Sequence, residues 1–254
     1  MMEGKIRTVD RVAVISDVHG NVMALRAVLA EALRERPDVL VNLGCLTYGP
    51  EPSPVAEILR WVPVPVLSVR GNGDRAVLEL ASGQRSPESE RDRFVLDNHD
   101  QASLSLLRET QATHRLVVRG LGPVVFCHGS PRSDVELITP ETPVERLREA
   151  IGESGCDVLA TGHTHLQFDR RLDFIRSVGP GSVGLPYHDG PPGARWAIFG
   201  PDIQLRITPY DIAAAAEAAS AAGFPDSHRW IQALRTPPTA AEVIAHAEGV
   251  QFSD

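Results

Sequence analysis

Cysteine is scarce in this sequence. The chain has three cysteines, Cys45, Cys127 and Cys156, which are odd in number and widely spaced. Small secreted domains stabilised by disulfides usually carry an even number of cysteines at short, regular spacings. The pattern therefore argues against a disulfide framework and favours a reducing compartment, and we expect a cytoplasmic protein.

Long apolar runs and an excess of basic residues are also absent. No stretch approaches the roughly 18 apolar residues of a membrane span, and residues 1–16 contain no signal-like apolar segment. The formal net charge is −8, and a field of that sign repels nucleic-acid phosphates and anionic membranes. We therefore expect no dedicated nucleic-acid binding and no membrane association.

What the sequence does contain is an alternation of apolar runs and helical periodicity. Hydrophobic residues make up 43% of the 254 residues, which is enough to bury a sizeable core. Strands are expected at 12–15, 39–43, 64–69, 114–118, 124–127 and 157–160, and near 174–177, 196–199 and 204–207. Helices are expected from about 21 to 33, near 54, at 101–108 and 144–151, and in the alanine-rich C-terminal part, whereas 82–93 reads as an exposed polar excursion. The first strands and helices predict a βαβαβ unit with a parallel sheet, whose ligands bind at the carboxyl ends of the strands.

Polar side chains that coordinate cations follow several of these strands. They are Asp17, His19, Asn72, His128, His163 and His165. Each short motif is common by itself, and a solvated polar loop would account for any one of them. Their recurrence at the same edge of the sheet predicts a shared site. Mixed carboxylate, imidazole and amide ligands suit Mn, Fe, Zn or Ni better than Mg or Ca, so we expect two such divalent metal ions.

Six motifs in order give the chain a resemblance to a known family. They are DVHGN (17–21), GCLTYGP (44–50), GNGD (71–74), CHGSP (127–131), GHTH (162–165) and GPGSVGLP (179–186). Over about residues 11–210 the sequence resembles the bacterial calcineurin-like phosphodiesterases. The resemblance implies an α/β (α+β) fold, a four-layer αββα sandwich with a dinuclear metal centre. We expect one metallophosphoesterase domain over residues 1–254, with a catalytic core at 11–210 and a helical extension at 211–254.

The same resemblance implies a ligand set. Asp17, His19 and His165 would hold one metal, and Asn72, His128 and His163 would hold the other. The family has a bridging aspartate at the position of Cys45. A cysteine thiolate would bridge the metals through one sulfur and favour Zn or Fe. The alternative is that Cys45 is a small buried residue, which leaves a weakened or mononuclear site.

A second departure from the family pattern is Gly73, where many relatives carry a histidine that protonates the leaving group. Without that acid, activated diesters or pyrophosphates would be better substrates than alkyl monoesters. Asp74 is expected to orient His19 or a neighbouring ligand, or else to sit at a helix N-terminus. Arg75 and His188 are predicted to contact the substrate, although an exposed helix arginine and a surface histidine are the alternatives.

These patterns predict a phosphoester hydrolase, a phosphodiesterase or phosphatase that acts on a small phosphorylated substrate by in-line attack of a metal-activated hydroxide. The alternative is a non-catalytic phosphate- or nucleotide-binding homologue, because both Cys45 and Gly73 depart from the family pattern. A thiol enzyme with Cys45 as nucleophile is disfavoured, since no histidine base is expected beside it.

Overall fold

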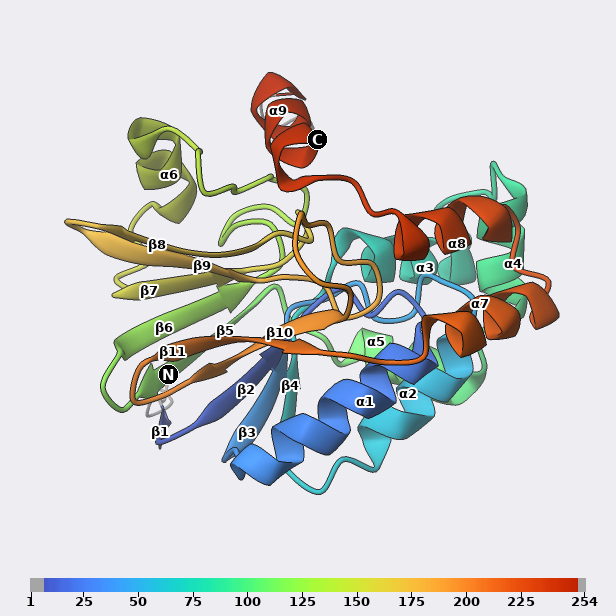
Figure 1. Cartoon of the computed structure of the whole chain (residues 1–254), viewed down its shortest axis with the longest axis horizontal. Helices are drawn as coiled ribbons and strands as arrows, with labels where there is room; N and C mark the ends of the chain where they lie inside the picture. The colour runs from blue at the N-terminus through green and yellow to red at the C-terminus, as the bar shows by residue number, and fades with distance from the viewer. Residues whose placement is uncertain (1–6, 251–254) are drawn as a thin grey trace.

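Two stacked β-sheets with helices on both outer faces form the body of the protein (Figure 1). The computed structural model describes residues 7–250, and residues 1–6 and 251–254 lie outside this description. The four-layer αββα order expected for this α/β chain is confirmed. Within residues 7–250, none of the helices combines the length and the apolar character that crossing a bilayer demands.

One sheet carries the first three predicted strands side by side. Its order is β11-β10-β2-β3-β4, and the bounds are β2 (Val12–Ile15), β3 (Val39–Asn42), β4 (Val66–Ser68), β10 (Ala194–Phe199) and β11 (Ile203–Thr208). Strands β2, β3 and β4 are parallel, whereas β10 runs antiparallel to β2 and β11. The loops that follow these parallel strands therefore lie at one edge of the sheet, as the sequence predicts.

The other sheet has the order β1-β5-β6-β7-β9-β8. Its bounds are β1 (Thr8–Val9), β5 (Thr113–Val118), β6 (Gly122–Cys127), β7 (Val158–Thr161), β8 (Gln167–Leu172) and β9 (Ile175–Pro180). Strands β6, β7 and β9 are parallel to one another, so their loops also share one edge. Strand β8 was not predicted. Phe168 is the one buried residue of β8, so pairing with β9 and not an apolar pattern of its own sets the place of this strand.

The helices cover the outer faces and one end of the two sheets (Figure 1). They are α1 (Val22–Ala32), η1 (Leu33–Glu35), α2 (Pro52–Arg60), α3 (Asn72–Ser82), α4 (Glu90–Asp97), α5 (Gln101–Arg108), α6 (Val144–Ile151), α7 (Ile212–Ala221), α8 (Ser227–Arg235) and α9 (Ala240–Val250). The expectation of an exposed excursion at 82–93 is wrong in part, because α4 begins there and Asp92 is buried. Its carboxylate accepts a hydrogen bond from Tyr48 Oη and pairs with Arg85, which makes the burial of a charge tolerable.

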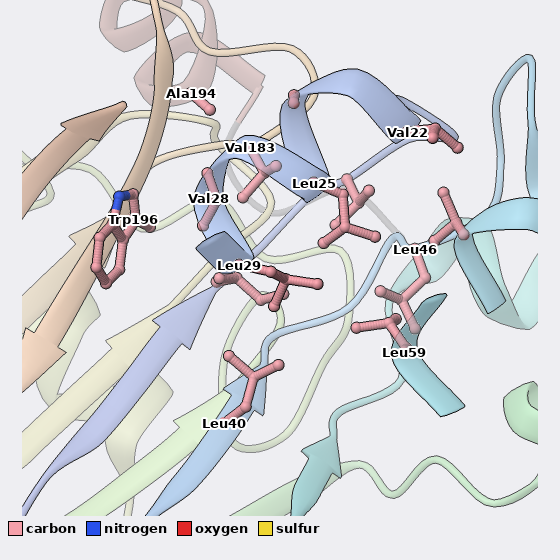
Figure 2. Close-up of a cluster of buried hydrophobic side chains, with 14 of the residues drawn as sticks. Val22, Leu25, Val28, Leu29, Leu40, Leu46, Leu59, Val183, Ala194 and Trp196 are labelled. Carbon is pink, nitrogen blue, oxygen red and sulfur yellow. The ribbon is translucent and has the colours of Figure 1, made fainter. Parts of the chain in front are cut away.

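Apolar side chains fill the spaces between these layers. Val14, Val41 and Phe126 lie between the two sheets. In the helical layer outside the five-stranded sheet, Leu25 and Val28 of α1 pack against the outer face of that sheet (Figure 2). The periodic burial of α1 and its N-cap, where the Asn21 side chain accepts from the Ala24 amide, agree with the sequence prediction.

The last helix covers the opposite face. Helix α9 lies near α6, above the six-stranded sheet (Figure 1), and its Val243 and Ile244 pack into the apolar cluster of that layer. Glu248 accepts hydrogen bonds from Thr139 and Thr142 and pairs with Arg146. Helix α9 is thereby attached to the long loop that follows β6.

Just before α9, the chain is attached to a second loop. The amide of His188 donates to the Pro238 carbonyl at 3.0 Å, and the amide of Ala240 donates to the Asp189 carboxylate at 3.1 Å. The C-terminal segment therefore holds two loops, 128–143 and 184–193, and residues of both lie beside the site described below.

Candidate metal centre

Backbone strain marks the edge where the loops of both sheets meet. Five of the predicted site residues have φ in the left-handed region: Asp17 (53°), His19 (47°), Cys45 (54°), His163 (65°) and His165 (59°). This region costs a residue other than glycine roughly 1–2 kcal/mol. Such strain persists where the surrounding structure enforces it, and it is common at functional sites.

Three predicted ligands form a first group. Asp17 Oδ1 lies 3.4 Å from His165 Nε2 and 3.7 Å from His19 Nε2. The two Nε2 atoms are themselves 3.1 Å apart. A carboxylate oxygen and two imidazole nitrogens therefore point at one place, in the grouping that the resemblance implied.

A second group forms around Asn72 and His128. Asn72 Oδ1 lies 3.0 Å from His128 Nε2, and the rings of His128 and His163 have centroids 4.9 Å apart. The sulfur of Cys45 lies 3.1 Å from Asn72 Oδ1 and 3.2 Å from His128 Nε2. The expectation that no histidine lies beside Cys45 is therefore wrong, and Cys45 belongs to the second group by direct contact.

Cys45 also reaches the first group. One ligand atom from each of Asp17, His19 and Cys45 lies within 4.8 Å of the others. Burial and the charges of Asp17 and Asp74 raise the pKa of the Cys45 thiol well above its usual value, and its S–H donates to Asn72. The sulfur stands between the two groups, where a bridging ligand would stand.

The donor atoms fit a cation. Asp17 Oδ1 is buried and has no hydrogen-bond partner among the described residues, whereas Oδ2 accepts from Ser16 Oγ and the His163 amide. Burial alone would raise the pKa of Asp17, but the nearby imidazoles, that of His165 foremost, lower it. Burial lowers the pKa of His19 to about 4 and that of His163 to about 3, so both rings are neutral and keep a lone pair for a metal.

Backbone carbonyls fix the orientation of three imidazoles. His19 Nδ1 lies 3.2 Å from the Tyr48 carbonyl, His128 Nδ1 lies 2.7 Å from that of Leu43, and His165 Nδ1 lies 2.7 Å from that of Leu185. A proton on each Nδ1 leaves Nε2 as the coordinating atom. Imidazoles that bind metals in proteins are commonly held in this way.

Asp74 does not orient His19. Its carboxylate accepts from the backbone amides of Gly71, Cys45 and Leu46 at 3.0, 2.8 and 2.9 Å. The residue lies in the first turn of α3, as the helix-terminus alternative requires, and it holds the backbone of a neighbouring candidate ligand. Its action on the site therefore runs through the strained backbone of Cys45.

The space beside Gly73 is nearly closed. A Cβ atom at this position would lie 3.2 Å from Cys45 Sγ and 3.2 Å from Tyr48 Cβ, closer than ordinary van der Waals contact. The Gly73 amide also donates to Cys45 Sγ at 3.4 Å. The two departures from the family pattern therefore touch each other.

Arg75 and His188 are the two residues that the sequence predicts to contact the substrate. Arg75 makes two hydrogen bonds to the Asp134 carboxylate, at 2.7 and 3.1 Å, and one to Glu79, so it is an ion-paired helix arginine. None of the described contacts joins His188 to the candidate ligands. Its neighbour Tyr187 stacks on the His165 ring, with centroids 4.7 Å apart and planes at 27°.

Two residues near the centre carry no sequence signal strong enough to predict a role for them. Arg70 lines a cavity beside His128, and Tyr187 covers His165. Arg70 directly precedes the motif that contains Asn72, and this proximity is the one signal that pointed to it. Nothing local to Tyr187 distinguishes it from a core tyrosine.

Comparisons with known proteins identify the family of the chain and proteins of similar structure. The family model for the calcineurin-like phosphoesterase superfamily domain matches residues 11–199. A crystal structure of a metallophosphoesterase from Sphaerobacter thermophilus is 27% identical, with a TM-score of 0.71 over 90% of this chain and 99% of the other. A hypothetical protein from Pyrococcus horikoshii is 18% identical, with a TM-score of 0.74 over 91% and 98% of the two chains, and shows the same fold. No curated protein matches the chain.

Proposed function

Since this chain belongs to the calcineurin-like phosphoesterase superfamily, we propose that it hydrolyses phosphoesters at a centre of two divalent cations. The observation that carries the proposal is the place of Cys45. Its sulfur contacts Asn72 and His128 on one side and lies within 4.8 Å of ligand atoms of Asp17 and His19 on the other. One residue thus connects two groups of donor atoms, which supports a dinuclear site with a sulfur in place of a carboxylate.

The residues of the two groups would hold one cation each. Asp17, His19 and His165 would bind the first, and Asn72, His128 and His163 the second. Two divalent cations lower the pKa of bound water and neutralise charge on phosphoryl oxygens. The candidate metals are Mn, Fe, Zn and Ni, and a Cys45 thiolate favours Zn or Fe.

The protein residues contribute mainly by holding the candidate ligands in place, and less by transferring protons. Carbonyls hold the imidazoles with Nε2 facing inward, and Asp74 holds the Cys45 backbone. At position 73 the chain has no acid to protonate a leaving group, and Tyr48 Oη is engaged with Asp92. Substrates whose leaving groups depart as stable anions are therefore favoured, such as activated phosphodiesters and pyrophosphates.

The test combines metal content, spectroscopy and turnover. The purified protein is analysed for metals and assayed on bis-p-nitrophenyl phosphate with Mn or Zn, beside Cys45→Asp, Cys45→Ser and the matched control Cys156→Ser. We expect two metals per chain, hydrolysis, and a sulfur-to-metal charge-transfer band in the Co-substituted protein that Cys45→Ser loses and Cys156→Ser keeps.

The opposite result is equally clear. A wild-type protein that binds fewer than two metals and is inert, while Cys45→Asp gains both the second metal and activity, would show a non-catalytic homologue. Turnover by the wild type with a changed metal preference in Cys45→Asp supports the thiolate-bridged enzyme.

A further inference from the structure

A cavity of about 510 Å³ adjoins the candidate metal centre on one side. Residues 130–135 line it together with Arg70, Arg75, Ala112 and His128. His128 is the one predicted metal ligand in this lining. The cavity therefore meets the second ligand group at His128, so a group attached to a phosphoryl bound at the centre can enter it.

The arginines of the cavity wall differ in whether an acidic side chain pairs with them. Arg75 is neutralised by Asp134 and Glu79, and Arg132 pairs with Glu136. The partly buried guanidinium of Arg70 makes no hydrogen bond or ion pair with any residue in the described part of the chain. Its positive charge is thus available to a ligand.

The backbone fixes the place of Arg70. Its amide donates to the Gln111 carbonyl at 2.8 Å, and the preceding Val69 forms a β-bridge with Gln111. Asn72 follows two positions later at the start of α3. The side chain is therefore anchored beside the metal centre by the same loop that supplies a candidate ligand.

The residue types that line the cavity limit which chemical groups it can bind. It consists of arginine, serine, proline, alanine, aspartate, valine and histidine, without phenylalanine, tyrosine or tryptophan. Bases bound by proteins outside a duplex usually stack on such rings. A guanidinium without a partner is instead well suited to a phosphate, which accepts two parallel hydrogen bonds from it.

We propose that this cavity binds a second phosphate of the substrate through Arg70, so that the substrate class is compact organic molecules with two phosphates, of which the one that is cleaved belongs to an activated ester or an anhydride, rather than nucleotides or simple esters. The inference rests on the proposed function for the first phosphate, which the cations would hold. The net charge of −8 repels a molecule with two phosphates, and a localised arginine offsets that repulsion at the site.

The test compares ligands with one and two phosphonates on the metal-loaded protein. Propane-1,3-diphosphonate and propylphosphonate have the same carbon chain and resist hydrolysis, and their binding is measured by calorimetry. We expect the diphosphonate to bind about tenfold more tightly or better, since a hydrogen-bonded charge pair contributes at least that factor. Arg70→Gln should remove most of this preference, whereas Arg108→Gln, which removes an exposed arginine on α5, should keep it.

A second variant guards against a folding defect in the first. Ala112 is exposed and lines the cavity, so Ala112→Glu places a negative charge there without disturbing the core, and it should weaken the diphosphonate selectively. Equal weakening of both ligands by Arg70→Gln would overturn the proposal, because Arg70 would then serve the first phosphate. Unchanged binding of both ligands in both variants would also overturn it.

The outcome is separable from that of the hydrolase test. A diphosphonate preference that depends on Arg70, in a protein that does not turn over bis-p-nitrophenyl phosphate, would support the subsite and refute the hydrolase. Turnover without any such preference would do the reverse.

Discussion

Metal loading should stabilise the fold by a measurable amount, because a buried carboxylate oxygen of the candidate site has no hydrogen-bond partner among the described residues. Asp17 Oδ1 is buried without a hydrogen-bond partner in the described part of the chain, and it faces the Nε2 atoms of His19 and His165. A ligand present at 100 times its Kd stabilises the native state by about 2.7 kcal/mol. For a chain of this size each kcal/mol shifts Tm by about 2–4 °C, so chelation should lower Tm by about 5–10 °C.

The assay is scanning calorimetry of the metal-loaded protein with and without chelator. Asp17→Asn removes the charge of the first ligand group and should lose more than half of the shift. Asp173→Asn alters an exposed aspartate in the turn between β8 and β9 and should keep all of it. A wild-type Tm that chelation does not change, or an equal shift in wild type and Asp17→Asn, would refute the reasoning.

Three further predictions concern the core, the site wall and pH. Leu25→Ala opens a cavity in the helical layer and should cost about 2–5 kcal/mol in urea unfolding; a loss below 1 kcal/mol would contradict the packing described. Tyr187→Leu removes the ring stacked on His165 and should weaken metal binding about tenfold in a calorimetric titration, while Tyr187→Phe retains the affinity. Burial lowers the pKa of His99, so the unfolded chain takes up its proton first as pH falls, and this residue's contribution to stability is complete above about pH 6.5 and declines below it. His99→Gln should flatten that decline in unfolding measured between pH 7 and 5, and an unchanged slope would count against the assignment.

Much of the fold could be predicted because local pattern and tertiary structure agree. The apolar spacing predicts α5, α6 and β2 at the observed residues, and β6 with a start two residues too late. Strand β8 escaped prediction because its sequence QFDRRL buries little and depends on pairing with β9. The burial of Asp92 cannot be predicted from the sequence for a related reason, since its partners Tyr48 and Arg85 come from other segments.

The candidate ligands could be predicted because each one ends or follows a strand in a recognisable motif. What those motifs do not contain is the direction of a neighbouring side chain. Asp74 reads equally well as a partner of His19 or as a helix-terminal carboxylate, and only the folded backbone shows three amides converging on it. The motifs also do not show that the Arg70 guanidinium lacks an acidic partner among the described residues, because that depends on where the acidic side chains lie in the fold.

The attachment of α9 has a consequence for where the functional unit ends. The family match stops at residue 199, and every candidate ligand precedes that point. However, Glu248 is hydrogen-bonded to the loop after β6. The Pro238 carbonyl is hydrogen-bonded to the loop whose Tyr187 stacks on His165. A chain trimmed to the shared family region would keep all of the candidate ligands and lose the contacts that hold two loops beside them, so the C-terminal segment contributes to the candidate site.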